Sequence, residues 1–398
     1  MLTEEALSKI ADDIEQDIIG WRRHFHKYPE LELECHETAK YVSQMLDSFG
    51  LEVITGVARS GVVGILKGNN PGPVVALRVD MDALPIQEET GLPFASVYDG
   101  VMHACGHDGH TAVGLGVAQV LSRCKDSLSG TIKFIFQPGE ETPGGAIVMI
   151  DEGVLADPDV EAVFGLHVFP DFQSGSVGIK YGTICASCDK FVIEVTGKGG
   201  HGARPNQCID PIAAAAYLVT DIQSIVSRNN DPLSPLVISV CQINGGAEFN
   251  IIPDKVVLRG ALRAISEDSR MLAHNQLNNK LKGVEAGFGT QCEIKYNVEA
   301  PALVNDHNLT RFVDEQSTQI LGSDNVKHIE MPSMGADDFA FFSSKIPSVY
   351  VRLGCNDKNK RFKYQLHTSR FDFDETALIK GTKLFSWLLY KYLRESHD

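Results

Sequence analysis

Short apolar runs recur along the first half of the chain, and several stop at acidic residues or histidines. Residues 4–27 place Trp21, Phe25 and several isoleucines at helical spacing, which predicts a helix. Residues 37–49 predict a second helix, which Gly50 ends. Continuous apolar runs bounded by turns are typical of buried strands, and together these elements predict an α/β domain. The runs lie at residues 62–66, 74–79, 131–136 and 162–166.

The pattern changes between about residues 184 and 299. Strands and helices there follow the order strand, helix, strand, strand, helix, strand, which is that of a ferredoxin-like βαββαβ unit. We therefore expect a catalytic domain in two segments, residues 1–183 and 300–398, with a lid domain inserted as residues 184–299. The predicted lid elements are strands over 190–196, 235–242, 255–265 and 292–298, and helices over 210–227 and 267–288.

Composition and charge limit the kinds of binding partner that the protein can have. The chain has 398 residues, of which 43% are hydrophobic and 22% charged, as in an ordinary globular protein large enough for two domains. Its formal net charge of -16 argues against nucleic acid and anionic membranes as partners. The acidic N-terminus lacks the order of a signal peptide, and no apolar run is long enough to span a bilayer. Nine scattered cysteines argue against a disulfide framework, so we expect a cytoplasmic protein.

Metal chemistry is indicated by the segment Gly100–His110, which reads GVMHACGHDGH. Cys105 and His107 lie two positions apart in a glycine-flanked turn, so their side chains can point the same way. A thiolate and an imidazole so arranged can bind a zinc-like or manganese-like ion. Taken alone, a buried cysteine beside loop histidines explains the turn equally well. His103 and His110 are interpreted as supporting groups outside the ligand set.

Further candidates lie where predicted strands end, which is where open α/β sheets place their ligands. They are Asp80 and Asp82 after residue 79, Glu140 and Glu141 after residue 136, and His167 after residue 166. His367, in a later loop, is the last candidate. Adjacent carboxylates point in different directions, so Glu140 and Glu141 predict two roles: one binds metal and the other faces a bound water. By contrast, His24 and His26, which follow Arg22 and Arg23 near the end of the first helix, are interpreted as solvated or packing residues.

The predicted ligand set has five members: Cys105, His107, Glu141, His167 and His367. Such a mixed set is too large for one tetrahedral structural site and suits two divalent ions that share a bridging group and a water. The positive charge left on such a centre would stabilise an oxyanion. Glu140 is then placed to take a proton from the water and pass it to a leaving amine. Thiolate and imidazole favour zinc, carboxylate and water favour manganese, and cobalt and nickel are alternatives.

Eight stretches of the chain, one of which is the segment Gly100–His110, together resemble the motifs of a known family and occur in the same order. They are WRRHFHKYPELELE, RVDMDALP, GVMHACGHDGH, FQPGEE, GHGARP, NIIPD, MGADDFA and LHTSRFDFDE, with the His167 strand end between the fourth and the fifth. Together they cover nearly the whole chain. The sequence resembles the amidohydrolase branch of the aminoacylase and carboxypeptidase metalloenzyme family, which includes hippurate hydrolases, N-acyl-amino-acid amidohydrolases and hydrolases of auxin–amino-acid conjugates.

The resemblance implies a two-metal α/β catalytic domain with an inserted lid that pairs two chains into a homodimer. It implies the five ligands already named, Glu140 as the general base, and Asp82 as support for the metal site. It also implies that His201, Asn250 and Arg263 on the lid hold substrate oxygens and the substrate carboxylate. In relatives the histidine equivalent to His201 can reach the site of the partner subunit.

The expected activity is hydrolysis of N-acyl-L-amino acids, which are small-molecule substrates, to a carboxylate and a free amino acid. A dipeptidase or carboxypeptidase and an N-acetyl-diaminopimelate deacetylase are alternatives within enzymes. A non-catalytic metal-binding protein is disfavoured, because a purely structural site needs neither Glu140 nor Asp82. Asn206 and Ala261 depart from the pattern of the branch and leave the substrate preference open.

Overall fold

The computed structural model describes residues 2–142, 144–357 and 362–395, which form two compact units. The first unit takes the described residues of 1–182, 304–331 and 341–398, and the second takes 183–303 and 332–340. The second segment of the second unit was not indicated by the sequence pattern, because it is a short loop far along the chain from the insert. No helix of the described residues is long and apolar enough to cross a membrane.

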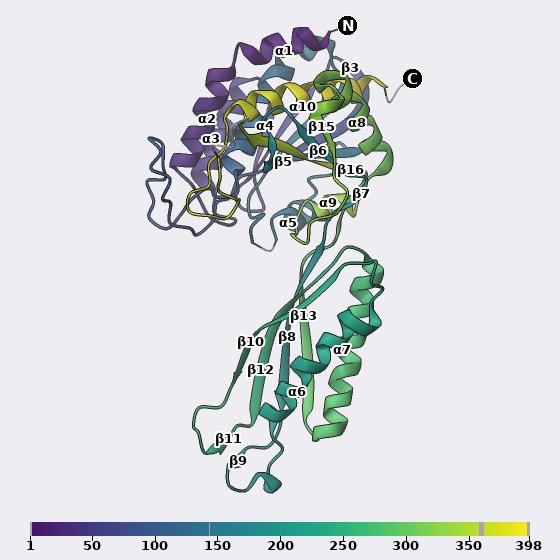
Figure 1. Cartoon of the computed structure of the whole chain (residues 1–398). Helices are drawn as coiled ribbons and strands as arrows, with labels where there is room; N and C mark the ends of the chain where they lie inside the picture. Colours follow the sequence, from purple (N-terminus) through teal and green to yellow (C-terminus); the bar gives the residue numbers. More distant parts are fainter. Residues whose placement is uncertain (1, 143, 358–361, 396–398) are drawn as a thin grey trace. The chain divides into compact units, whose positions relative to one another are not determined.

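The first unit is built on an eight-stranded mixed sheet (Figure 1). Its four central strands run parallel to one another, so their C-terminal ends meet at one edge of the sheet. The outer strands β1, β2 and β6 pair antiparallel with their inner neighbours. In spatial order the strands are β1 (Glu52–Val57), β2 (Gly61–Lys67), β4 (Ser129–Gln137), β3 (Asn70–Asp80), β5 (Ala162–Gln173), β16 (Ser348–Asn356), β6 (Val177–Ile179) and β15 (Val326–His328).

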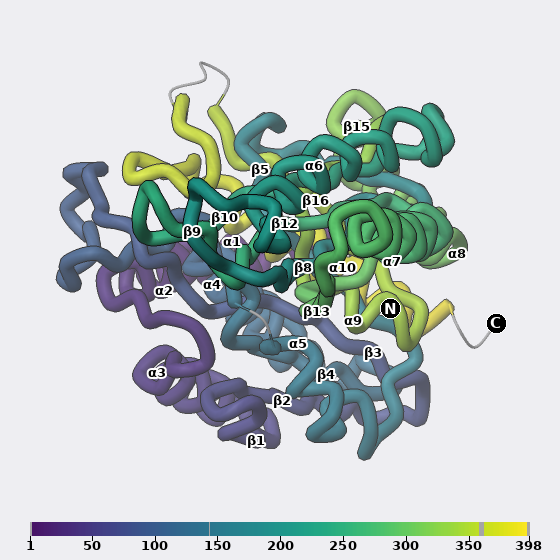
Figure 2. Tube along the Cα trace, turned by 90° about the horizontal axis from the view of Figure 1, so that it is seen from below, coloured from purple at the N-terminus to yellow at the C-terminus, as the bar shows by residue number. Residues whose placement is uncertain are grey.

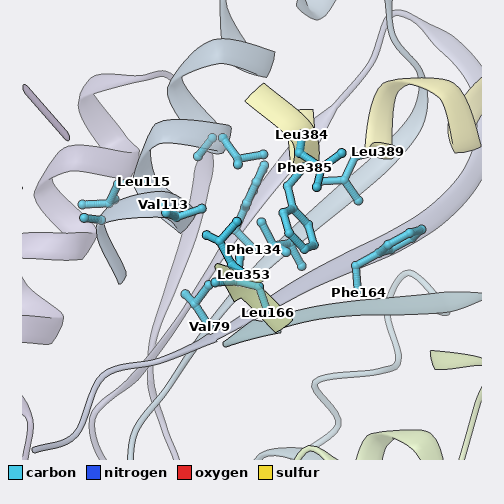
Figure 3. Packing of buried hydrophobic residues seen from close by; sticks show 14 of the residues in the cluster. Val79, Val113, Leu115, Phe134, Phe164, Leu166, Leu353, Leu384, Phe385 and Leu389 are labelled. Carbon is cyan, nitrogen blue, oxygen red and sulfur yellow. The ribbon is translucent and has the colours of Figure 1, made fainter. Parts of the chain in front are cut away.

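Helices α4 and α10 cover one face of the sheet, and their apolar side chains meet those of the central strands in the main core (Figure 3). Helix α3 lies beside β1 and β2 (Figure 2). The single helix predicted over residues 4–27 is wrong, because Asp13 and Ile14 leave the helical path and divide it in two. The helices are α1 (Glu4–Asp12), α2 (Glu15–Lys27), α3 (His36–Ser48), α4 (His107–Ser122), α5 (Gly145–Asp151), α8 (His307–Leu321), α9 (Ala340–Ser343) and α10 (Thr376–Glu395).

Helix α4 is nearly all buried, and its glycines allow this. A Cβ at Gly114 would lie 2.8 Å from Val79 of β3, and one at Gly116 would lie 2.7 Å from Thr382 of α10. Real Cβ atoms do not approach neighbours so closely, so the small residues let the helix lie tightly between sheet and C-terminal helix. The helix therefore starts at a fixed place over the C-terminal edge of β3 and β5.

The second unit is an antiparallel four-stranded sheet with two helices on one face. Its element order confirms the predicted βαββαβ unit, and α7 is seen end-on beside α6 in Figure 2. Alternate residues of β8 are buried under the helices, as expected for a sheet covered on one face. The elements are β10 (Leu236–Gly245), β12 (Lys255–Ala264), β8 (Ser187–Thr196) and β13 (Gln291–Ala300) in spatial order, with α6 (Pro211–Ser224), α7 (Glu267–Phe288) and a small ladder of β9 (Gly200–His201) and β11 (Ile251–Ile252).

Candidate metal centre

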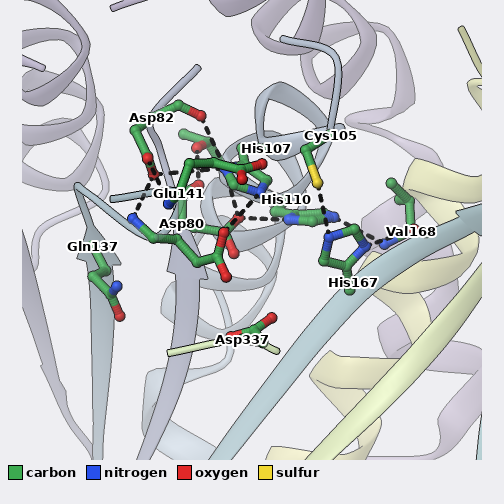
Figure 4. Close-up of polar contacts among 12 residues, drawn as sticks. Asp80, Asp82, Cys105, His107, His110, Gln137, Glu141, His167, Val168 and Asp337 are labelled. Carbon is green, nitrogen blue, oxygen red and sulfur yellow. Dashed lines mark hydrogen bonds and ion pairs between the residues drawn. The ribbon is translucent and has the colours of Figure 1, made fainter. Parts of the chain in front are cut away.

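Chemically active side chains converge at the C-terminal edge of the central strands of the first unit (Figure 4). Asp80 ends β3, Glu141 lies in the loop after β4, and His167 lies within β5, which continues well past the predicted end of that strand. Cys105 and His107 stand at the start of α4. His367 comes from the loop before α10, and its backbone N–H donates to the carbonyl oxygen of Ala104 at 2.8 Å.

The turn between Cys105 and His107 depends on Gly106. This glycine has φ of 88°, in the left-handed region, and it is the N-cap of α4. A Cβ there would also lie 2.4 Å from Val168 of β5. Glycine thus lets the chain turn sharply against β5, which brings the thiol of Cys105 and the ring of His107 to the same place.

The candidate ligand atoms form two overlapping groups. The ligand atoms of Cys105, His107 and His167 all lie within 4.8 Å of one another, and so do those of Cys105, Glu141 and His367. Cys105 Sγ is 3.3 Å from His167 Nε2 and 3.2 Å from His367 Nε2. Glu141 Oε1 is 3.1 Å from His367 Nε2. The structure thus brings all five predicted ligands together, with the sulfur of Cys105 common to both groups.

The histidine tautomers fit metal binding. His107 Nδ1 donates to the carbonyl oxygen of Asp82 at 2.8 Å, and His167 Nδ1 donates to that of Val168 at 2.6 Å. A carbonyl only accepts, so each Nδ1 carries a proton and Nε2 is the nitrogen left for a metal ion. His107 Nε2 is buried and has no hydrogen-bond partner among the described residues. Such an orphaned acceptor, with its ring held from behind, is the arrangement of a metal-binding histidine.

The charges of the centre favour a bound cation. Burial works against a proton on His107, but Asp80, Asp82 and Glu141 outweigh it and raise its pKa to about 10. Burial, with Glu141 and Glu140 nearby, raises the pKa of the Cys105 thiol. Burial lowers the pKa of His167, which keeps that ring neutral. The field is therefore negative, and a divalent ion would be attracted and would favour the thiolate.

Asp82 holds the two adjacent glutamates by their backbone. Its carboxylate oxygens accept hydrogen bonds from the N–H groups of Glu140 and Glu141, each at 3.0 Å. Both side chains reach the centre, because ligand atoms of His107, Glu140 and Glu141 lie within 4.8 Å of one another. Glu141 also belongs to the group with Cys105 and His367, while Glu140 Oε2 lies 3.9 Å from His107 Nε2.

His110 has both ring nitrogens occupied. The N–H of Val168 donates to its Nε2 at 2.8 Å, so its proton lies on Nδ1 and donates to Asp80 at 2.5 Å. No nitrogen of this ring is left for a metal ion. Asp80 is held from the other side by Arg78 at 2.6 Å, so the end of β3 is fully occupied as well. Both nitrogens of His103 are buried without a partner among the described residues, and we have no physical account of that.

A buried ion cluster behind the centre was missed by sequence reasoning. Arg22 is 1% exposed and binds Asp108 at 2.9 Å, Asp372 at 2.8 Å and Glu375 at 3.2 Å. His26 is also buried, and its ring nitrogens contact Asp108 at 2.8 Å and Glu88 at 3.2 Å. His26, interpreted as a solvated or packing residue, is therefore buried in a charged cluster with Arg22, which that interpretation did not include. The acidic FDFDE segment that follows His367 was the available signal, since it supplies two of the partners.

The three candidate substrate-binding residues of the lid lie in the second unit. His201 is exposed and pairs with Ile251 in the β9–β11 ladder, and the N–H of Gly202 donates to the carbonyl oxygen of Asn250 at 2.8 Å. The structure thus brings His201 and Asn250 together at one end of the unit. Arg263 lies near the other end of β12, where its guanidinium donates to the carbonyl oxygen of Met334 at 2.9 Å.

Comparison with known proteins identifies the family. The model of peptidase family M20/M25/M40 matches residues 76–391. The chain belongs to this family. It is 40% identical over 372 residues to the N-acetylcysteine deacetylase of Bacillus subtilis, covering 93% of this chain and 95% of that protein. It is 43% identical over 305 residues to the N-acyl-L-amino acid amidohydrolase of Geobacillus stearothermophilus, covering 76% and 82%.

A solved structure supports the same assignment. The Bacillus subtilis YxeP protein, a dinuclear metal-binding peptidase of family M20, superposes with a TM-score of 0.84 at 34% identity over 96% of this chain and 99% of that one. The predicted fold, an α/β catalytic domain with a separate ferredoxin-like lid, is confirmed. The chain is a metal-dependent amidohydrolase of the M20 family.

Proposed function

We propose that the chain hydrolyses the amide bond of N-acyl-L-amino acids at a two-metal centre held by five ligands. The observation that carries the proposal is the pair of ligand groups sharing Cys105, with two histidine lone pairs directed at them. The activities named for the similar deacetylase and amidohydrolase are of this kind. The ligands are Cys105, His107, Glu141, His167 and His367.

Two divalent ions, when bound, would supply Lewis acidity for the attacked carbonyl and lower the pKa of a water. Glu140 takes the proton of that water and later gives it to the leaving nitrogen. One water is consumed, the C–N bond breaks, and a carboxylate and an amino acid with a free amine leave. Asp82 keeps Glu140 in place by holding its backbone N–H. Zinc and manganese both suit the mixed sulfur, nitrogen and oxygen ligand set.

The lid residues favour a homodimer. His201 and Asn250 lie at the Lys255 end of β12, whereas Arg263 lies near its far end. A ten-residue strand spans roughly 30 Å, which is longer than an N-acyl amino acid. If all three residues contact one substrate, His201 and Asn250 must come from a second chain. The edge strands β10 and β13 offer backbone for such pairing.

The test is metal removal and reloading combined with a substrate panel. Protein stripped with a chelator should lose hydrolysis of N-acetyl and N-benzoyl amino acids and recover it with two equivalents of zinc or manganese. Matched dipeptides with a free amine should be poor substrates, because the proposal assigns Glu141 to metal and Glu140 to the water and gives the amine no carboxylate partner. Full activity of exhaustively stripped protein would exclude the metal centre, and a preference for dipeptides would favour a peptidase instead.

A further inference from the structure

Three arginines of the described residues are buried: Arg22, Arg78 and Arg352. The first two are neutralised by carboxylates, Arg22 by three and Arg78 by Asp80. Arg352 is 7% exposed and has no carboxylate within ion-pair distance and no hydrogen-bond acceptor among the described residues. Its guanidinium instead makes a cation–π contact: the guanidinium carbon lies 4.2 Å from the ring centroid of Phe169.

Arg352 lies beside the metal centre. In the parallel pairing of β16 with β5, Arg352 is the register partner of His167. Paired residues of neighbouring strands point to the same face, at a strand spacing of about 4.8 Å. The residues on either side, such as Leu166 and Leu353, face the main core. His167, Phe169 and Arg352 therefore share the opposite face of the sheet, and His167 is the member of this row that belongs to the metal centre.

A buried guanidinium without an anion is unfavourable, because it loses its hydration and gains no ion pair in exchange. Divalent ions bound beside His167 would add repulsion. The chain has a large excess of acidic residues, yet none of those described neutralises this cation. The Phe169 ring lies against the guanidinium, and the N–H groups, which have no acceptor among the described residues, match the two oxygens of a carboxylate.

We propose that Arg352 is a specificity-determining residue that binds a carboxylate of the substrate. The proposal rests on the proposed amide hydrolysis at the neighbouring metal centre. Three substrate carboxylates share the required chemistry: the α-carboxylate of the amino acid, a carboxylate on its side chain, and one at the end of the acyl chain. Arg263 on the second unit is a separate candidate for the α-carboxylate.

The experiment compares wild type with Arg352→Met, Arg352→Lys and, as a control that removes an exposed arginine, Arg123→Met. Four substrates separate the sources: N-acetyl-leucine, N-acetyl-leucinamide, N-acetyl-glutamate and N-succinyl-leucine. We measure KM and kcat separately, metal content, and the affinity of each compound for Glu140→Gln protein with and without Arg352→Met by calorimetry.

Arg352→Met should weaken binding of the recognised carboxylate by about 10- to 100-fold, raise KM in parallel and leave kcat within a few-fold. Arg352→Lys should recover part of the loss.

The outcomes are distinct. A penalty with N-acetyl-leucine that disappears with the amide assigns the α-carboxylate, and a penalty confined to the glutamate or succinyl compound assigns the other groups. Equal penalties for all four compounds, including the uncharged amide, would overturn the proposal. Because removal of an unpaired buried charge relieves the fold, the Tm of Arg352→Met should stay constant or rise, and a large drop in Tm or a loss of metal would also overturn it. Failure of wild type to hydrolyse any of the four would contradict the proposed function, while calorimetry would still decide the role of Arg352.

Discussion

The metal centre and the His201–Asn250 end of the lid differ in how their side chains are held. In the centre, the rings of His107 and His167 are each fixed by a second bond, which the backbone carbonyls of Asp82 and Val168 accept. At the lid end, His201 is exposed, and the neighbouring Phe249 is 99% exposed. The first region is prepared for its chemistry within one chain. The second holds its groups by a two-residue ladder and a few local hydrogen bonds at the surface, so its role depends on what it meets.

The largest effect should come from the two adjacent glutamates. Glu140→Gln should lower kcat by a factor on the order of 10²–10⁴ with both metals retained, because it removes a proton acceptor and no ligand. Glu141→Ala should instead lose metal, since it removes a ligand atom of the group with Cys105. Metal analysis beside steady-state kinetics checks both variants. Near wild-type turnover by metal-loaded Glu140→Gln would remove Glu140 as the base.

The second effect concerns the stability of the region behind the centre. Arg22→Met should destabilise the first unit by about 3–5 kcal/mol, because it leaves buried carboxylates, Asp108 above all, without their cation. Arg23→Met is the matched control: Arg23 is half exposed and binds Glu375, so its loss should cost less than about 1 kcal/mol. Calorimetry of both variants should show the loss in the transition of the first unit. Equal losses for Arg22→Met and Arg23→Met would contradict the burial argument.

The contrast between Arg22 and Arg23 also shows what local sequence can and cannot predict. Strands β2, β3, β4 and β5 followed from apolar runs, and the Cys-x-His turn and the strand ends indicated which groups meet, because those signals are local. Strand β1 was missed because it is a largely exposed edge without a continuous apolar run. The partners of Arg22 lie 86 and more than 300 residues away, and no local pattern records such a distance. Arg352 was missed because the lack of a counterion becomes visible only when the neighbours are known.

The third effect separates the lid end from the centre. His201→Ala should lower kcat by about 10²–10³, the loss expected for one oxyanion donor, without a change in Tm or metal content. The His201 side chain touches no candidate metal ligand and is exposed, so a purely structural role of this residue predicts no change in kcat.

Mixing the inactive variants His201→Ala and Glu140→Gln tests whether the donor comes from the second chain. Mixed dimers would then hold one site with both groups and regain activity after subunit exchange. If exchange is demonstrated and no activity returns, His201 acts within its own chain or not in catalysis.

The smallest effect is a pH dependence of the cluster behind the centre. Burial would lower the pKa of His26, but its bonds to Asp108 and Glu88 outweigh burial and the repulsion of Arg22, and its pKa is raised. The folded protein therefore holds this proton more tightly than the unfolded chain does. The stabilisation is complete below about pH 6.5, the ordinary histidine pKa, and is lost as the pH rises through the raised value. The Tm of wild type should exceed that of His26→Gln by a few degrees at pH 6, and the difference should shrink toward high pH.

His24→Gln is the control of opposite sign: burial, aided by Lys27, lowers the pKa of His24, so protonation there favours the unfolded chain at low pH. If the two differences vary with pH in the same direction, Asp108 and Glu88 do not hold a proton on His26, and Arg22 alone neutralises the cluster.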